Sequence, residues 1–216
     1  MSWGGGILKS DYEVFKYPGL NLGDAHAEAH DKAQPLLFGF WVFLMSDAIL
    51  FGIVFATYAT DRLATAGGPD QRALYDLTSV FIETMLLLTS SFTFGMASLA
   101  LKYKHPTARL VGWLVVTVLL GAAFVGFEIN DFLGMIAKGG VPERSAFLSA
   151  FFDLVPLHGL HVTAACIWLL AMLGQIRRYG IDTDAKLGLL RLALFWHFLD
   201  IVWVAIFSVV YLSGLV

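Results

Sequence analysis

The stretch VPLHGLHVTAACIWLL, residues 155–170, is apolar enough to lie inside a membrane, yet it carries two histidines. His158 and His161 are three residues apart, so both side chains belong to one face of a helix. In the whole chain of 216 residues, 58% are hydrophobic and 14% are charged, and the mean hydropathy is +0.73. Soluble domains of this length rarely have such a composition. The stretch is therefore interpreted as one span of a polytopic membrane protein.

Five apolar stretches are each long enough to cross about 30 Å of hydrocarbon. They lie near residues 34–60, 74–101, 109–136, 152–176 and 192–214. The segments between them are rich in charge, glycine and proline, which is typical of connections. The sequence therefore predicts an all-α transmembrane bundle of five helices over 34–216, preceded by a polar cytoplasmic tail over 1–33.

The distribution of Lys and Arg predicts the orientation, because positive residues gather on the cytoplasmic side. The N-terminal tail and the second and fourth connections carry Lys9, Lys16, Lys32, Lys102, Lys104, Arg109, Arg177, Arg178, Lys186 and Arg191, whereas the other side has Arg62, Arg72, Lys138 and Arg144. We expect a cytoplasmic N-terminus and, after five crossings, a periplasmic C-terminus. Arg177 and Arg178 are then expected to meet anionic lipid headgroups at the inner surface.

The composition also excludes several kinds of function. A net charge of −3 argues against binding of nucleic acid. Cys166 is the single cysteine, so no disulfide, cysteine-pair metal site or haem-attachment motif can form. The first residues lack the charged start, apolar core and small-residue cleavage site of a signal peptide.

Small residues recur every four positions in three of the expected spans. In lipid, such rows let helix backbones approach closely, and they predict a tight bundle. The rows are Ala48, Gly52 and Ala56; Ser91 and Gly95; and Ala122 and Gly126.

Seven ionisable side chains lie within the apolar segments, where a charge costs about 2.5–3.5 kcal/mol near the bilayer centre. Each is therefore a candidate for a functional site or an obligatory contact. They are Asp47, Glu83, Glu128, His158, His161, His197 and Asp200. At about 1.5 Å per residue, the first five share a layer in the outer half. His197, about 15 Å shallower than His158 and His161, forms a second level with Asp200.

This predicted depth disfavours a haem, because a haem between helices needs two histidines at matching depth on facing helices. A metal site from Glu83, Glu128 and His161 stays open, although the repeated Glu-x-x-His pairs of di-metal bundles do not occur. The preferred interpretation is structural, with no catalytic residue and no metal ligand. We expect Glu128 to pair with His158 or His161, and Asp47 and Glu83 to share a proton or find other partners in their layer.

Five motifs occur in an order that resembles a known family. They are GFWVFLMSDAILFG, ETMLLLTSSFTFGMA, GAAFVGFEINDF, LHGLHV and FWHFLDIVWVAIFSVVYL. Their order is similar to that in subunit III of the haem–copper terminal oxidases, over about residues 34–215. Five spans instead of seven, and Asp47 in the first motif where the cytochrome c oxidase branch usually has Glu, bring the chain closest to the cytochrome bo-type ubiquinol oxidases.

The resemblance implies a supporting role in a complex that oxidises ubiquinol, reduces oxygen to water and moves protons outward. Such a subunit has no haem or copper of its own, since these belong to neighbouring subunits. It packs against subunit I beside subunits II and IV in the bacterial inner membrane, and it binds phospholipid. By residue match, Asp47 takes the place of a buried family carboxylate, Glu128 belongs to an acidic motif, and Glu83 matches less sharply. The family signatures contain His158, His161, His197 and Asp200.

Two alternatives remain open from the sequence. The first keeps the structural role but assigns the chain to a cytochrome c oxidase. The second, from another class, is an independent proton channel or carrier that uses Asp47, Glu83 and Glu128. A break of about 8–10 Å between the two expected polar levels weakens such a pathway.

Overall fold

The computed structural model describes residues 26–67, 77–103 and 106–212, with side chains from residue 34 onward. Residues 1–25 of the predicted tail lie outside this part. Within it, the regular structure is helical. The long helices are α2 (His26–Asp61), α4 (Leu77–Lys102), α5 (Thr107–Ala137), α6 (Ala146–Tyr179) and α7 (Thr183–Ile206). A 3₁₀ turn, η1 (Pro142–Arg144), precedes α6, and a π-helical segment, η2 (Phe207–Leu212), extends α7.

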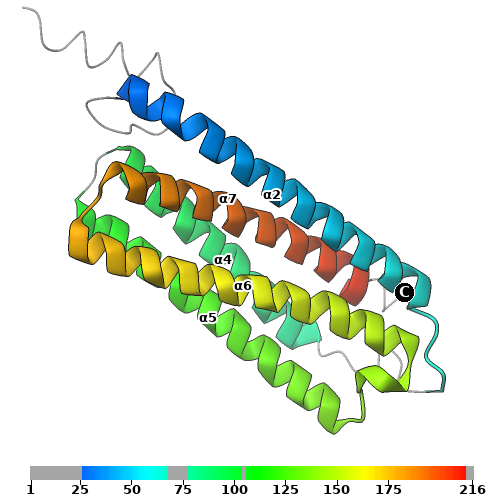
Figure 1. Cartoon of the computed structure of the whole chain (residues 1–216). Coiled ribbons are helices and arrows are strands. Elements are labelled where there is room, and N and C mark those ends of the chain that lie inside the picture. The colour runs from blue at the N-terminus through cyan, green and yellow to red at the C-terminus, as the bar shows by residue number, and fades with distance from the viewer. Residues whose placement is uncertain (1–25, 68–76, 104–105, 213–216) are drawn as a thin grey trace, which may run out of the picture.

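Five helices in the described residues are long and apolar enough to cross a membrane, which confirms the predicted fold class. Figure 1 shows them running side by side as an elongated bundle. Two connections between them are short, so α4 is antiparallel to α5 and α6 is antiparallel to α7.

The last helix begins nine residues before the expected start at 192, because Asp182 provides a local start signal. The Oδ1 atom of Asp182 accepts a hydrogen bond from the backbone N–H of Ala185 at 2.7 Å, which caps the helix. Lys186 and Arg191 had suggested a loop, but both lie within the first turns of α7. Similarly, Ser145 caps α6 through Leu148, so α6 begins at 146 and not near 152.

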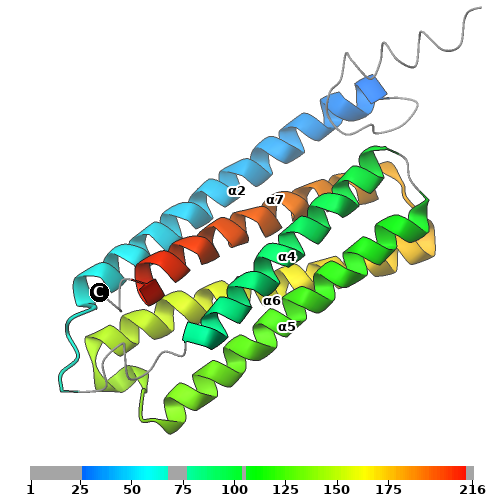
Figure 2. The ribbon, with the colours of Figure 1, turned by 180° about the vertical axis from the view of Figure 1, so that it is seen from behind.

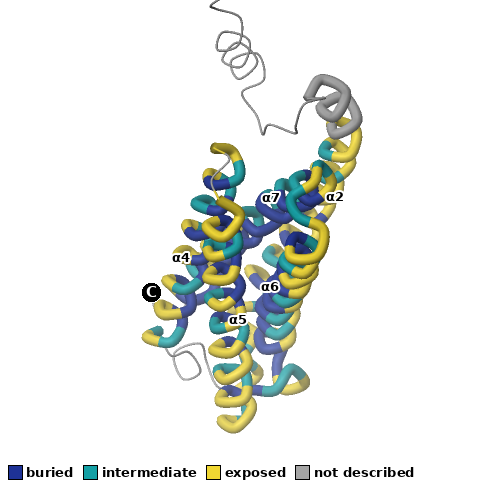
Figure 3. The backbone as a smooth tube through the Cα atoms, turned by 90° about the vertical axis from the view of Figure 1, so that its left-hand side faces the viewer, coloured by how far each residue is buried: buried dark blue, intermediate teal, exposed yellow. Residues whose placement is uncertain are grey.

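The helices divide into a core group and a peripheral helix. Helix α4 packs on α5 and α7, and α6 contacts α2, α5 and α7. Helix α2 lies along one side of the bundle against α6 and α7, as the front and rear views agree (Figures 1 and 2). Figure 3 shows that buried residues gather where helices face each other and that exposed residues cover their outer faces.

Close approach between helices occurs at other glycines than predicted. A Cβ atom added to Gly52, Gly95 or Gly126 would meet no atom within 4 Å, so these small residues do not create the tight contacts of the bundle. The close approach predicted at these three positions is therefore absent within the described residues. Instead, a Cβ at Gly121 would lie 2.9 Å from Cη2 of Trp196, and one at Gly188 would lie 2.8 Å from Cε of Met172.

Candidate functional site: polar side chains inside the bundle

His158 lies at the centre of the contact between α5, α6 and α7. It is fully buried, and its Nε2–H donates to the backbone carbonyl of Leu199 at 3.2 Å. Its ring packs on Trp203, with centroids 5.1 Å apart, and edge-on to Phe124 at 5.8 Å. Trp203 in turn donates through Nε1 to Oγ1 of Thr84 on α4 at 3.1 Å. This cluster thus joins four helices through one histidine and one tryptophan.

His161 faces a different helix, although it follows His158 by one turn. Its Nε2 lies 3.3 Å from Oδ1 of Asp47 on α2. Its Nδ1 lies 2.7 Å from the carbonyl oxygen of Leu157. A carbonyl oxygen only accepts, so Nδ1 must carry a hydrogen. The contact between Nε2 and Asp47 links α6 to α2.

Glu128 does not have the histidine partner that the sequence predicted. His158 bonds Leu199 and His161 contacts Asp47, whereas Oε1 of Glu128 has no hydrogen-bond partner among the described residues. The carboxyl group of Glu128 instead lies against the backbone of α6. A Cβ at Gly159 would fall 2.7 Å from its Cδ atom, so only glycine leaves the space. The partner of Glu128 depends on the register of α5 against α6, and the spacing of residues in the sequence does not give that register.

Glu83 lies in a group of acids between α4 and α5. It is buried within electrostatic range of Glu128 and Asp131, and its Oε1 has no hydrogen-bond partner among the described residues. Asp131 is half-buried and follows Glu128 by three residues, on the same helix face. The sequence reasoning missed Asp131, although this spacing from Glu128 was a usable signal.

His197 and Asp200 form a third group, on the α4 side of α7. Nδ1 of His197 lies 2.7 Å from Oγ of Ser91 and 3.6 Å from Oδ2 of Asp200. Asp200 is buried, but 45% of the His197 side chain is exposed. The sequence predicted only a packing role for Ser91.

The predicted depth difference of about 15 Å between His197 and the other histidines is wrong. Because α7 starts at Thr183, His197 lies about 21 Å along this helix. The contact from His158 to Leu199, the residue before Asp200, brings both predicted levels together. Counted in the same way from Tyr179 at the end of α6, His161 and His158 lie about 27 and 32 Å in, so the difference in depth is about 6–11 Å. The polar groups differ mainly in the helices toward which their side chains point.

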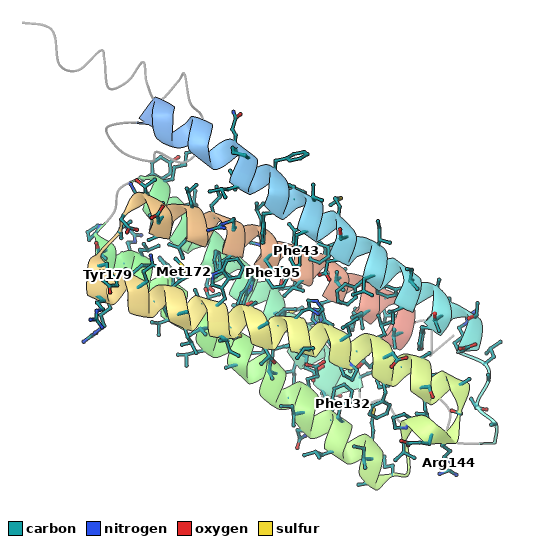
Figure 4. All side chains as sticks on the ribbon, in the orientation of Figure 1. Phe43, Phe132, Arg144, Met172, Tyr179 and Phe195 are labelled. Carbon is teal, nitrogen blue, oxygen red and sulfur yellow. The ribbon has the colours of Figure 1, made fainter. Side chains whose placement is uncertain are left out.

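Hydroxyl groups contribute further contacts that the sequence analysis did not single out. Nε1 of Trp196 donates to Oγ of Ser90 at 3.0 Å, and the hydroxyls of Thr93 and Thr117 are 2.8 Å apart. These contacts join α4 to α7 and α5. At the α2–α7 contact, by comparison, Figure 4 shows the aromatic rings of Phe43 and Phe195, with centroids 6.2 Å apart.

Among residues 26–67, 77–103 and 106–212, no group of three His, Cys, Asp or Glu side chains has an arrangement that could hold a metal ion. The combination of Glu83, Glu128 and His161 does not form, because His161 faces α2. Arg177 and Arg178 lie exposed in the last turn of α6.

The arrangement of spans and motifs agrees with one family. A family model described as cytochrome c oxidase subunit III matches residues 21–215. The chain belongs to the subunit III family of the haem–copper oxidases.

Named relatives of this subunit III cover most of its length. It is 49% identical over 193 residues to the cytochrome bo(3) ubiquinol oxidase subunit 3 of Pseudomonas aeruginosa, covering 89% of this chain and 92% of the relative. The equivalent subunit of Pseudomonas putida is 50% identical over 185 residues, covering 86% and 89%. The cytochrome c oxidase subunit 3 of Alkalihalophilus pseudofirmus is 44% identical over 177 residues, covering 82% and 85%.

Family membership confirms the resemblance drawn from the motifs and the multi-pass location in the bacterial inner membrane. It also means that this subunit III has other oxidase subunits as partners. Its polar groups are consequently placed in a chain that works within a larger assembly.

Proposed function

We propose that the chain is a non-catalytic subunit of a proton-pumping ubiquinol oxidase in the aerobic respiratory chain. It packs on subunit I, next to subunits II and IV, and it supports the integrity of the catalytic subunit. The observation that carries this proposal is the identity of 49% and 50% to two chains named as ubiquinol oxidase subunits. The excess of Lys and Arg on one side supports a cytoplasmic N-terminus and a periplasmic C-terminus.

The contacts of the buried histidines support a structural role, and the proposal assigns no haem or metal to this chain. Nε2 of His158 is engaged by the Leu199 carbonyl, and both nitrogens of His161 have protein partners. Nδ1 of His158 is buried without a hydrogen-bond partner among the described residues, but no group of three possible ligands lies around it there. These side chains join helices, which is what a supporting subunit requires.

The outer surface supports binding of phospholipid. Large apolar side chains on the outer faces of the helices are suited to acyl chains, for example Phe92 of α4, Leu119 of α5 and Ile167 of α6. Arg177 and Arg178 are exposed at one end of the bundle, where they would meet anionic headgroups.

The test is purification of the intact complex through a tag on this chain. We expect the other oxidase subunits to copurify, the preparation to oxidise ubiquinol, and haem to remain with the other subunits after dissociation. Haem retained by the separated chain, or absence of the other subunits, would overturn the proposal.

A cytochrome c oxidase is the second candidate, since the relative in Alkalihalophilus pseudofirmus carries that name at 44% identity. The same preparation separates the two. Oxidation of cytochrome c together with the spectroscopic signature of a dicopper centre in subunit II would favour the second candidate.

An independent proton channel or carrier is the remaining alternative, and the buried carboxyl oxygens of Glu83 and Glu128 without hydrogen-bond partners among the described residues motivate it. The chain alone, reconstituted in vesicles, tests it. We expect no proton flux above that of empty vesicles. Flux that disappears in Glu83→Gln would favour the channel.

A further inference from the structure

His197 is half-exposed at a depth where hydrocarbon is expected around it. The last span runs over Thr183–Leu212, 30 residues, and His197 is near its middle. Ser91, its hydrogen-bond partner, is likewise near the middle of Leu77–Lys102. With 45% of its side chain exposed, His197 differs from His158, which is fully buried.

The contacts within the chain occupy one side of the imidazole. Ser91 and Asp200 both approach Nδ1, at 2.7 and 3.6 Å. No described residue provides a hydrogen bond to Nε2. In either neutral tautomer, Nε2 therefore presents an unused donor or acceptor.

Lipid is a poor match for this atom. Acyl chains offer no hydrogen-bonding group, and headgroups lie about 15 Å from the bilayer midplane. An unpaired polar group in hydrocarbon costs several kcal/mol. The chemistry of this position therefore calls for a polar group carried to the midplane by another transmembrane segment.

The surrounding surface leaves room for such a segment. Gly95 follows Ser91 by one turn on α4, and a Cβ there would meet no atom within 4 Å. Ile201 follows His197 by one turn on α7 and is 70% exposed. The rear view shows α7 between α2 and α4 (Figure 2). We call Ser91, Gly95, His197 and Ile201 the His197 face.

We propose that the His197 face docks a transmembrane helix of a partner oxidase subunit, which supplies a hydrogen-bonding group to Nε2 of His197. The inference rests on the proposed function, because it assumes that the chain works inside an oxidase complex. It adds the face of this chain that meets the partner and the chemistry that the partner must present.

Two substitutions separate the contact of Nδ1 with Ser91 inside the chain from the proposed contact of Nε2 with the partner helix. The amide of Asn reaches about the position of Nδ1, whereas the amide of Gln reaches that of Nε2. We expect His197→Asn to weaken retention of this chain by the complex roughly three- to fifteen-fold, the range of single interhelical hydrogen bonds in membranes. We expect His197→Gln to stay within about twofold of wild type.

The measurement is the fraction of this chain that copurifies with a tagged partner subunit over a detergent titration, divided by the amount in the membrane. Unfolding of each separated variant provides the control for folding. Equal retention of His197→Asn and wild type would overturn the inference, as would a loss that only follows lower folding stability. If wild type itself does not copurify with oxidase subunits, the proposed function fails; if wild type does and His197→Asn is unaffected, only this inference fails.

Photocrosslinking identifies the occupant directly. A photoreactive residue at Ile201 is expected to form an adduct with a partner oxidase subunit, whereas one at Leu119, 62% exposed on α5, serves as the matched site for comparison. Adducts at Ile201 with lipid alone, or with a second copy of this chain, would contradict the proposed partner.

Discussion

Helices α2 and α7 have similar apolar sequences but are held in the bundle in different ways. In the most apolar window of the last span, half of the residues are buried, compared with 17% in α2. Helix α7 contacts each of the other four long helices, and its two tryptophans both donate hydrogen bonds to α4. Helix α2 presents one narrow buried stripe to α6 and α7, namely Leu44, Asp47, Phe51 and Tyr58.

The difference shows that an apolar sequence places a helix in the membrane but does not determine the position of that helix within the bundle. Lipid is as apolar as leucine, so burial of apolar surface does not favour one helix–helix contact over contact with lipid. Packing and interhelical polar contacts must decide. The contact between Asp47 and His161 is one such polar contact, and it joins α2 to α6.

The largest expected effect is at the centre of the bundle. Trp203→Ala removes a fully buried ring that packs on His158 and bonds Thr84. We expect a loss of about 3–5 kcal/mol in the free energy of unfolding, measured by denaturant titration in mixed micelles. Ile201→Ala on the exposed face of the same helix is the control, with a change under about 0.5 kcal/mol. Equal losses would mean that α7 is not held by its buried face.

A smaller loss is expected where a carboxyl group meets a helix backbone. Gly159→Ala places a methyl group against Glu128, so we expect unfolding to become easier by about 1–3 kcal/mol. Gly126→Ala, where the added methyl meets nothing, should leave the unfolding free energy nearly unchanged. Combining Gly159→Ala with Glu128→Ala should recover part of the loss, and no recovery would argue against this contact.

The attachment of α2 is tested by its polar contact. Asp47→Ala leaves His161 without its partner, and we expect a loss of about 1 kcal/mol. Hydrogen exchange should increase in α2 before it increases in α7. The double-mutant cycle with His161→Phe isolates the pair, and additive losses in that cycle would show that the two side chains do not interact.

The smallest effect is expected at a single hydroxyl. Ser90→Ala removes the acceptor for Nε1 of Trp196, which should cost about 0.6 kcal/mol, a typical value for interhelical hydrogen bonds in membranes. Ser46→Ala provides the comparison, since the Ser46 hydroxyl bonds only its own helix at Val42. An equal effect of the two changes would remove the distinction between interhelical and local bonds.

Part of the candidate site was predictable from the sequence. An ionisable side chain inside an apolar span predicts a buried contact even when its partner is unknown. Asp47, Glu83 and Asp200 are indeed buried. The partners were not predictable, because Glu128 was expected to meet a histidine and meets the backbone at Gly159 instead. The contact of His197 with Ser91 was also missed, since serine is common in membrane helices as a small packing residue.

The sequence by itself determined five membrane-spanning helices and the family. Hydropathy, length and motif order depend on the residues of each segment and not on how the helices pack. Only the tertiary structure decided that His158 and His161, one turn apart, join different helices, and that the small residues Gly52 and Gly126 make no close helix contact. The physical reason is that rotation and register of one helix against another depend on the packing of all five together. A shift of nine residues in the start of α7 was enough to bring Leu199, next to Asp200, into contact with His158.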